Sequence, residues 1–293
     1  MKDARPIKAS GRLFSVGEIN TIREIVSAAK PPVRAEIARQ VCEHFDWRNV
    51  RGELKAMSCR VALLRLHRKG LIELPAPLNG NGNGKPLSKQ QPKLPKPEVL
   101  EGTVSDLTGL ELVLVGTKKA SALWNGLIDQ HHYLGYQPLP GAQLRYLIQW
   151  QGGLLGAIGW GAAAWKVAPR DQWIGWTTVQ RETQLNYLLN NARFLILPWV
   201  HCRNLASKVL ALSERRVAID FEARYGIRPV LLETFVEQQR FAGTCYRAAN
   251  WQHLGQTQGR GKCDRQHKKS LPIKDLYVRP LKKDFRLTLG VAG

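Results

Sequence analysis

ETFVEQQRFAGTCYRAANWQHLGQTQGRGK, residues 233–262, is the stretch of this chain that says most about its fold. An apolar strand ends at Glu233, a short helix is predicted around 246–250, and 251–255 has the pattern of a return strand. Residues 259–262 then turn glycine-rich and basic. A carboxylate at a strand end, a tyrosine in the next helix and a cationic loop are groups that transfer chemistry on a charged substrate would use.

The composition indicates a globular protein of one large domain or two modest ones. The chain has 293 residues, 44% of them hydrophobic. It contains no apolar run long enough for a membrane helix, and its first residues lack the apolar centre of a signal peptide, so we expect a cytoplasmic protein with no membrane contact. The five cysteines form no CxxC pair. We therefore expect reduced cysteines and no metal site, and no motif identifies a cofactor.

The charge is large and unevenly distributed. The formal net charge is +21, and residues 1–75 carry 15 basic and 8 acidic side chains, whereas 101–255 carry 15 and 11. Residues 256–293 carry 10 and 3. A nearly balanced middle with cationic ends favours DNA as a partner, because phosphate contacts are driven by counterion release. A solubility charge or a membrane-surface patch is the alternative.

The first 75 residues have the pattern of a winged helix-turn-helix domain. Helices are predicted over 15–29, with a capping box from Ser15, then from 33 to 45 and from 50 to 68. The third helix is expected to bury Leu54, Met57, Val61 and Leu64, and a short strand is expected at 71–74. A basic third helix with a trailing strand suits the major groove of DNA. A small helical domain that binds protein remains the alternative.

Residues 76–100, rich in Pro, Gly, Asn and Lys, are interpreted as a flexible linker. A mixed α/β domain is predicted for 101–258, followed by a basic C-terminal extension over 259–293. Its elements are expected in the order strand, helix, antiparallel hairpin, strand, long helix, strand, short helix and strand. The expected ranges are 110–115, 121–130, 144–150, 154–160, 193–197, 204–225, 230–236, 246–250 and 251–255.

This order, with RFLILP before a long helix and YxxxNWxxxG after the next strand, resembles the GCN5-related N-acetyltransferase (GNAT) fold. The resemblance implies a donor pyrophosphate on the backbone N–H groups of 200–206 and a tyrosine acid at Tyr246. The family's glycines are missing from 200–206. A side chain at each position would crowd a pyrophosphate, so some other donor, or none, is equally compatible with the sequence.

Several motifs together resemble the Druantia anti-phage protein DruA family, whose domain also occurs in transposase-like proteins. They are HHYLGY at 131–136, AAW at 163–165, RDxxIGW at 170–176, NNARFLILPWV at 190–200, NLAS at 204–207, ETFV at 233–236 and GTCYRAANWxxLGxTxGRG at 243–261. The resemblance implies a DNA-directed role in phage defence or transposition, with other defence or transposition proteins as partners.

Four residues are candidates for catalysis. Glu233 is the predicted base, because apolar neighbours disfavour its ionised form, and a salt bridge to Arg247 or Arg193 is its alternative. Tyr246 is the predicted acid. His132 could act as a base or, with His131, complement a helix dipole. Asp171 could be a carboxylate desolvated by indoles or half of an exposed ion pair.

A substrate pocket is predicted from aromatic and amide side chains that could hold a flipped or single-stranded base. Its residues are Trp165, Trp173, Trp176, Arg181, Asn190, Asn191 and Asn250. Packing in the core is the alternative for the tryptophans, and capping of strand ends is the alternative for the asparagines.

Phosphate contacts are predicted from the third helix and the basic segment near the C-terminus. These residues are Arg51, Lys55, Arg60, Arg65, Arg68, Arg260, Lys262, Arg265, Lys268 and Lys269.

The sequence leaves two hypotheses for the function. The protein is either an enzyme that transfers a group to a nucleobase or a non-catalytic DNA-recognition subunit of a defence or transposition complex.

Overall fold

The computed structural model describes residues 6–10, 12–30, 32–48, 52–78, 98–139, 141–151, 153–259 and 271–291. The chain divides into two compact units, Met1–Leu87 and Ser88–Gly293. Most of the predicted linker at 76–100 lies outside the described residues, and its last residue, Leu100, already belongs to a strand.

The first unit contains three helices and one short hairpin. Strands β1 (Ile7–Ala9) and β2 (Arg12–Phe14) pair antiparallel and precede α1 (Val16–Ala28), α2 (Arg34–His44) and α3 (Ala56–Arg68). The predicted capping box forms: Ser15 Oγ accepts from the Glu18 N–H, and the Glu18 carboxylate accepts from the Ser15 N–H. Buried side chains of all three helices and the hairpin meet in one core, which includes Phe14, Ile22, Ile37, Leu63 and Leu66.

Two predictions for this unit are wrong. The segment 71–74 is not a strand, because its backbone bonds instead to side chains: the Leu71 carbonyl accepts from Arg23, and the Leu74 N–H donates to His67. The buried face of α3 is also different. Cys59, Ala62, Leu63 and Leu66 are buried, whereas Met57 and Val61 are 68% and 43% exposed. The winged helix-turn-helix interpretation is therefore not confirmed.

The second unit is a mixed α/β domain built on one seven-stranded sheet. The strand order is β10-β11-β9-β7-β6-β5-β4, and all neighbours are antiparallel except β7 and β9. The strands are β4 (Glu111–Leu114), β5 (Leu144–Trp150), β6 (Gly153–Ala162), β7 (Leu188–Ile196), β9 (Leu231–Glu237), β10 (Gln252–Gln256) and β11 (Lys274–Pro280). The predicted order of elements from 110 to 255 is present.

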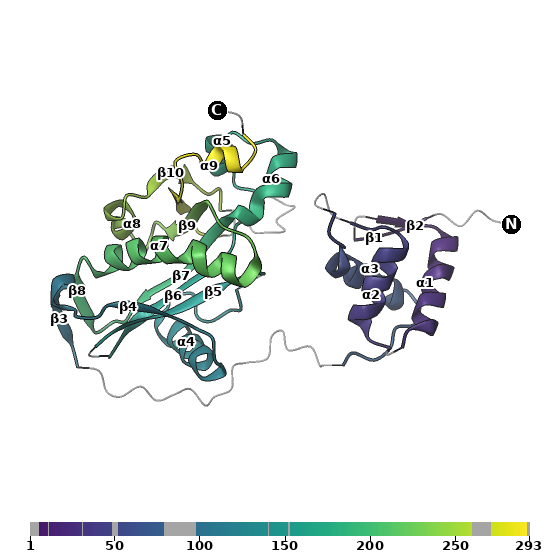
Figure 1. Ribbon diagram of the computed structural model, residues 1–293, viewed down its shortest axis with the longest axis horizontal. Helices are drawn as coiled ribbons and strands as arrows, with labels where there is room; N and C mark the ends of the chain where they lie inside the picture. The colour runs from purple at the N-terminus through teal and green to yellow at the C-terminus, as the bar shows by residue number, and fades with distance from the viewer. Residues whose placement is uncertain are drawn as a thin grey trace. The chain divides into compact units, whose positions relative to one another are not determined.

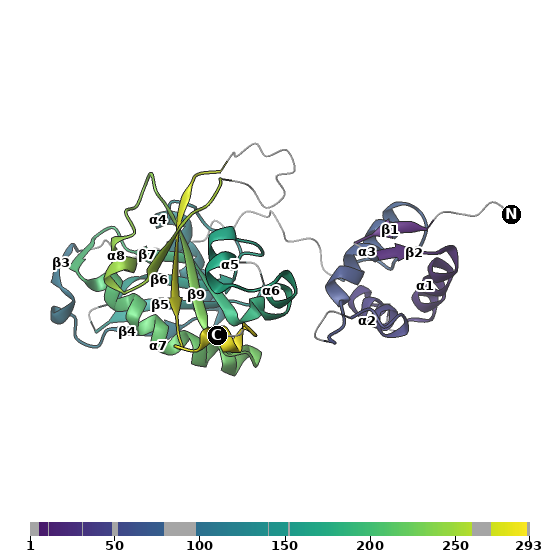
Figure 2. The ribbon, with the colours of Figure 1, turned by 90° about the horizontal axis from the view of Figure 1, so that it is seen from above.

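Helices cover both faces of this sheet. Figures 1 and 2 show α4 (Lys118–His131) and the long α7 (Leu205–Tyr225) on opposite sides of it. The short α8 (Thr244–Ala248) follows β9, and β3 (Leu100–Thr103) pairs in parallel with β8 (Val200–Arg203) beside the start of α7. Two 3-10 turns, Val104–Asp106 and Leu185–Tyr187, complete the connections.

Three helices and the last described residues close one end of the domain (Figure 1). The helices are α5 (Ala168–Ile174), α6 (Thr178–Gln184) and α9 (Phe285–Thr288), and Arg286 donates to the carbonyls of Trp173 and Ile174. The prediction of a separate C-terminal extension over 259–293 is thus wrong for its described part. Leu276, Tyr277 and Val278 are buried in β11, so this segment is an inner strand of the sheet.

Candidate functional site

The parallel strands β7 and β9 are paired over a short distance and then separate. Their register joins Leu188, Leu189 and Asn190 to Leu231, Leu232 and Glu233, respectively, and no later pair follows along these two described strands. A cavity of about 760 Å³ opens beyond this point. Its walls come from the C-terminal end of α4, from β7 and β9, and from 240–246. The separation of two parallel strands therefore creates the candidate site.

A β-bulge marks the place where β7 leaves β9. Gly159 of β6 is opposite Arg193, whereas Trp160 is opposite Asn191, so Ala192 has no partner on β6. The buried Asn191 side chain compensates for the interrupted ladder, because its Nδ2 donates to the carbonyls of Gly159 and Arg193 at 3.2 Å each. Asn191, predicted as a pocket residue, lines the cavity and holds the bulge in place.

Tyr246 lies at the cavity wall with its hydroxyl group already bonded. Its Oη donates to Asn191 Oδ1 at 2.7 Å, and Thr234 Oγ1 lies 3.4 Å away. Burial raises the pKa of this hydroxyl. The ring packs against Trp251 and Tyr277. Tyr246 thus ties α8 to the bulge in β7, and its proton is held by an internal acceptor.

Two cations in the cavity have incomplete partners. Arg193 Nη1 donates to the Ala192 carbonyl at 2.7 Å, whereas its Nε is buried without an acceptor, and burial lowers the pKa of this guanidinium. Lys274 lines the same cavity, and its ammonium has no ion-pair partner among the described residues. Arg240 differs, because its Nε lies 3.0 Å from the Glu237 carboxylate. The cavity is therefore lined by two cationic side chains, Arg193 and Lys274, to which an anion would bind.

His132 adds a neutral donor to this cavity. Burial lowers its pKa to about 4, and the positive charges of Arg193 and Lys274 act in the same direction. Its Nδ1 accepts from the Leu134 N–H at 3.2 Å. A backbone N–H can only donate, so the proton of the neutral ring is on Nε2. His132 consequently offers an N–H group, and in this form it is no base.

The predicted base Glu233 is directed away from Tyr246. Successive residues of a strand face opposite sides, so Thr234 meets Tyr246 whereas Glu233 meets α5. Both Glu233 oxygens are engaged: Oε2 accepts from Arg170 Nη1 at 2.7 Å, and Oε1 accepts from the Ala164 N–H at 2.8 Å. The Glu233 and Arg170 side chains are completely buried. The partner is thus Arg170, and neither Arg247 nor Arg193.

Asp171 belongs to the same ionic cluster. Its Oδ1 accepts from Arg170 at 2.7 Å and from Trp176 Nε1 at 3.1 Å, and Oδ2 lies 3.8 Å from Arg181. The Arg181 guanidinium lies 5.8 Å from the ring of Trp165, which is 57% exposed. The structure thus brings Glu233, Asp171, Trp176, Arg181 and Trp165 together. Their ionic contacts are separate from the hydrogen bonds that Tyr246 makes with Asn191 and Thr234.

The other predicted residues have varied positions. Asn190 lines the cavity, and its Oδ1 is buried without a partner. Trp173 stacks on Phe285 at 5.1 Å, and Asn250 lies past α8, where its carbonyl accepts from Arg279. On α3 and just before it, Lys55, Arg60, Arg65 and Arg68 are all exposed. The remaining predicted DNA contacts lie outside the described residues: Arg51, Arg260, Lys262, Arg265, Lys268 and Lys269.

Sequence reasoning missed the residues that give the cavity and the cluster their charge. Arg193 and Arg170 both lie inside quoted motifs, NNARFLILPWV and RDxxIGW, but neither was singled out as a site residue. Lys274 was counted only in the charge of the C-terminal region. The apolar triplet Leu-Tyr-Val at 276–278 is the sequence signal that places Lys274 at the start of a strand.

The residues before α7 do not fit coenzyme A in the manner that the GNAT resemblance implies. Val200–Arg203 forms β8, whose backbone is paired with β3. Asn204 follows in the left-handed region with φ 63°, and no glycine separates it from the strand. A pyrophosphate needs a close approach to free backbone N–H groups. No chemical step is therefore derived through this coenzyme.

The family model for the Druantia protein DruA matches residues 65–268. The chain belongs to this family. DruA membership implies a role in anti-phage defence. The search of curated proteins gave no match. No helix among the described residues is long and apolar enough to cross a membrane. The same residues contain no group of three or more His, Cys, Asp or Glu side chains arranged for a metal ion.

Solved structures similar to this DruA-family chain include several acetyltransferases. An N-acetyltransferase from Staphylococcus aureus Mu50 is 15% identical, with 59% of this chain and 99% of that chain covered and a TM-score of 0.36. An aminoglycoside acetyltransferase in complex with coenzyme A is 12% identical, with 61% of this chain and 99% of that chain covered and a TM-score of 0.39. An acetyltransferase from Salmonella typhimurium that modifies the N-terminal serine of ribosomal protein L7/L12 is 12% identical. It has 48% of this chain and 66% of that chain covered and a TM-score of 0.31.

Proposed function

We propose that this chain is a DNA-binding protein of anti-phage defence and that the cavity between β7 and β9 receives a phosphate-bearing nucleotide of the DNA. The observation that carries the proposal is the pair of cations that line the cavity without a carboxylate partner. Arg193 and Lys274 both line it, and neither has an ion-pair partner among the described residues. A phosphate makes charge-assisted hydrogen bonds with guanidinium and ammonium groups, which are stronger than neutral ones.

The aromatic lining supports a nucleotide rather than an inorganic anion. Tyr133, Phe241 and Phe194 line the cavity together with the cations, and Tyr133 packs against Phe241 at 5.3 Å. Aromatic faces accept any nucleobase by stacking, while guanidinium and ammonium groups bind its phosphate. The combination suits one nucleotide of a strand.

The outer face of α3 supports DNA binding by the first unit. Met57, Arg60, Val61, Leu64, Arg65 and Arg68 follow one another at spacings of one, three or four residues, so they share one side of the helix. Arginine and apolar side chains on one outer helix face are suited to phosphates and base edges in a groove. We therefore assign the duplex contact to α3.

The contacts of the four predicted catalytic groups favour non-catalytic DNA recognition and disfavour group transfer to a nucleobase. Glu233 and Asp171 are paired with arginines, Tyr246 donates to Asn191, and His132 Nδ1 accepts from a backbone N–H. A general base needs a free lone pair, and an acid needs a proton aimed at the substrate. Each candidate is held by its own chain instead. The recognition hypothesis is thus favoured.

The test of DNA binding by the cavity compares two cations that have no ion-pair partner with one that is already paired with a carboxylate. In the full-length chain, Arg193→Gln and Lys274→Gln should each weaken binding of a fluorescent single-stranded oligonucleotide severalfold. Arg240→Gln, which removes a cation already paired with Glu237, is the matched control and should have a smaller effect. Equal losses for all three variants would contradict a phosphate in the cavity.

The group-transfer hypothesis has its own measurement. Mass analysis of DNA nucleosides from cells that express the wild type or Glu233→Gln should find the same nucleosides in both. A new nucleoside mass that requires the intact chain would overturn the binding proposal and would restore an enzymatic one.

A further inference from the structure

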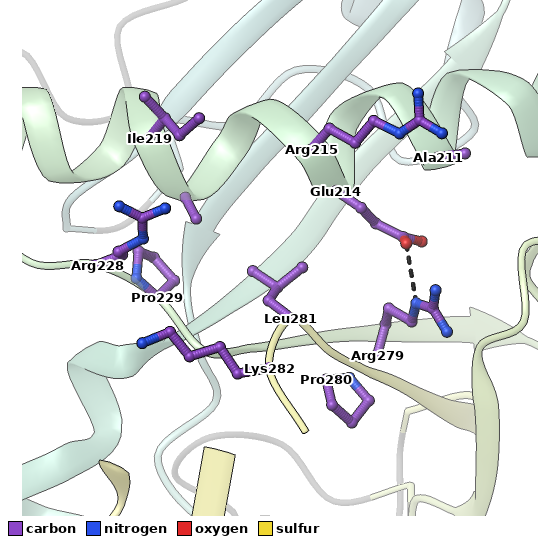
Figure 3. Close-up of a pocket in the computed structure, with 11 residues that line it drawn as sticks. Ala211, Glu214, Arg215, Ile219, Arg228, Pro229, Arg279, Pro280, Leu281 and Lys282 are labelled. Carbon is purple, nitrogen blue, oxygen red and sulfur yellow. Dashed lines mark hydrogen bonds and ion pairs between the residues drawn. The ribbon is translucent and has the colours of Figure 1, made fainter. Parts of the chain in front are cut away.

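A second hollow lies beside α7, outside the β7–β9 cavity. It is a groove of about 430 Å³ between α7, the turn at Arg228 and Pro229, and the segment 279–282 (Figure 3). Figure 3 shows Arg215 and Ile219 on the helix, with Arg228 and Lys282 across from them. None of these four residues was predicted to bind anything.

The charges of the groove leave an excess of cations. Glu214, the acidic residue of its lining, is neutralised by Arg279 at 2.9 Å and also accepts from Trp251 Nε1 at 2.8 Å. Arg228 is paired with Glu222 on the exposed surface at 2.9 Å. Arg215 and Lys282 are exposed, and neither has an ion-pair partner among the described residues. Two cations are therefore free to bind an anion.

Apolar side chains line the groove between these charges. Pro229, Pro280 and Leu281 line it opposite α7, and Ile219 is 54% exposed on the helix. An inorganic ion or a purely acidic peptide makes no use of such a surface. A nucleic acid strand does, because it alternates anionic phosphates with apolar sugar and base surfaces.

The groove continues along α7 toward its start. A smaller hollow that shares Ala211, Glu214 and Arg279 is also lined by Lys208. From Lys208 to Ile219 the helix rises by roughly 16 Å. The two hollows therefore extend along about three turns of α7.

We propose that this groove binds a single strand of DNA, with phosphates on Arg215, Lys282 and Lys208 and with sugars or bases on Pro280 and Leu281. The inference takes its ligand class from the proposed function but rests on different residues.

A membrane surface is less suited to the groove. Anchoring in lipid requires a continuous apolar helix face. On α7 the exposed Ile219 instead has charged neighbours on its own side of the helix, because Arg215 lies one turn before it and Glu222 one turn after it. A single exposed isoleucine between two charges offers too little apolar surface for a lipid anchor.

The experiment measures the salt dependence of oligonucleotide binding by the full-length chain. The double variant Arg215→Gln and Lys282→Gln should lower affinity for single-stranded DNA severalfold. The slope of log affinity against log salt should fall by about 1.4, because each single-strand phosphate contact contributes ~0.7. Arg215→Lys with Lys282→Arg keeps both charges and should restore the slope. Lys118→Gln with Lys119→Gln, two exposed lysines at the start of α4, is the control.

The outcomes separate this inference from the proposed function. An unchanged slope for the groove variant, or the same loss in the α4 control, overturns the inference. If the groove variant instead loses binding to phosphatidylserine vesicles while oligonucleotide binding is intact, the surface is a membrane site and the inference is wrong. If Arg193→Gln still weakens binding in these cases, the cavity proposal stands without the groove.

Discussion

Arg170 Nη1 donates to Glu233 Oε2 at 2.7 Å, and neither side chain is accessible to solvent. The pair joins α5 to the middle of β9. It lies where β9 is still paired with β7, since Glu233 is in register with Asn190. The pair therefore fixes the last contact before the two strands separate.

Arg170→Met should destabilise the second unit by about 3–5 kcal/mol, because it leaves the Glu233 carboxylate buried without its partner. Urea unfolding followed by tryptophan fluorescence measures the change. Arg228→Met breaks the exposed pair with Glu222 and should cost at most about 1 kcal/mol. Similar losses for both variants would show that the buried pair is not a major contributor.

Tyr246→Phe should lower the free energy of unfolding by about 1–3 kcal/mol, because Asn191 Oδ1 loses its donor in a buried position. Oligonucleotide binding should persist, since the hydroxyl serves the fold. Tyr136→Phe is the control, because its hydroxyl makes no hydrogen bond within the described part of the chain. A stable Tyr246→Phe protein that no longer bound DNA would assign the hydroxyl to the ligand instead.

Stability should depend on pH through His132. Its pKa is about 4 in the folded chain against 6.5 in the absence of burial. Between these values the unfolded chain binds a proton that the folded chain does not, so the free energy of unfolding falls as the pH falls from 6.5 toward 4. Above pH 6.5 this contribution is fully present.

His132→Asn keeps an acceptor near the Leu134 N–H and should remove this part of the pH dependence. Thermal unfolding between about pH 4 and pH 7, at about half-unit steps, measures it. His253→Gln alters an exposed histidine beside Asp275 and serves as the comparison. An identical profile for the wild type and His132→Asn would exclude His132 as the cause.

Removal of cations from the outer face of α3 should weaken duplex binding. For Arg60→Gln with Arg65→Gln, the slope of log affinity against log salt should fall by about 1.8, since each duplex phosphate contact contributes ~0.9. Arg39→Gln on α2 removes an arginine that is already paired with Glu36 and Glu43, and should change the slope less. Equal changes per charge removed would indicate a general electrostatic attraction rather than a contact by α3.

The order of elements in the second unit could be predicted because each strand and helix has a local signature. The apolar run before Glu233 and the long helix after Asn204 have boundaries within one residue of those observed. Local patterns do not reveal which face of a strand meets which neighbour when both faces are buried. Leu231, Leu232, Thr234 and Val236 are all buried, so no alternation indicated that Glu233 faces α5.

The other errors have similar causes. α3 carries two apolar stripes, and helical spacing cannot distinguish the buried one, with Leu63 and Leu66, from the exposed one, with Met57 and Val61. Strand β11 was not predicted, because the many basic residues around it favoured an exposed extension. Its place beside β9 depends on pairing between segments that are far apart in the chain. Such long-range pairings are fixed by the whole sheet and not by the local sequence.

The most direct measurement is a structure of the full-length chain with a short single-stranded oligonucleotide. A phosphate oxygen within hydrogen-bonding distance of the Arg193 guanidinium and of the Lys274 ammonium is the expected result, with a base against Tyr133 or Phe241. An oligonucleotide that is bound in the crystal, with no phosphate within hydrogen-bonding distance of either group, would contradict the central claim.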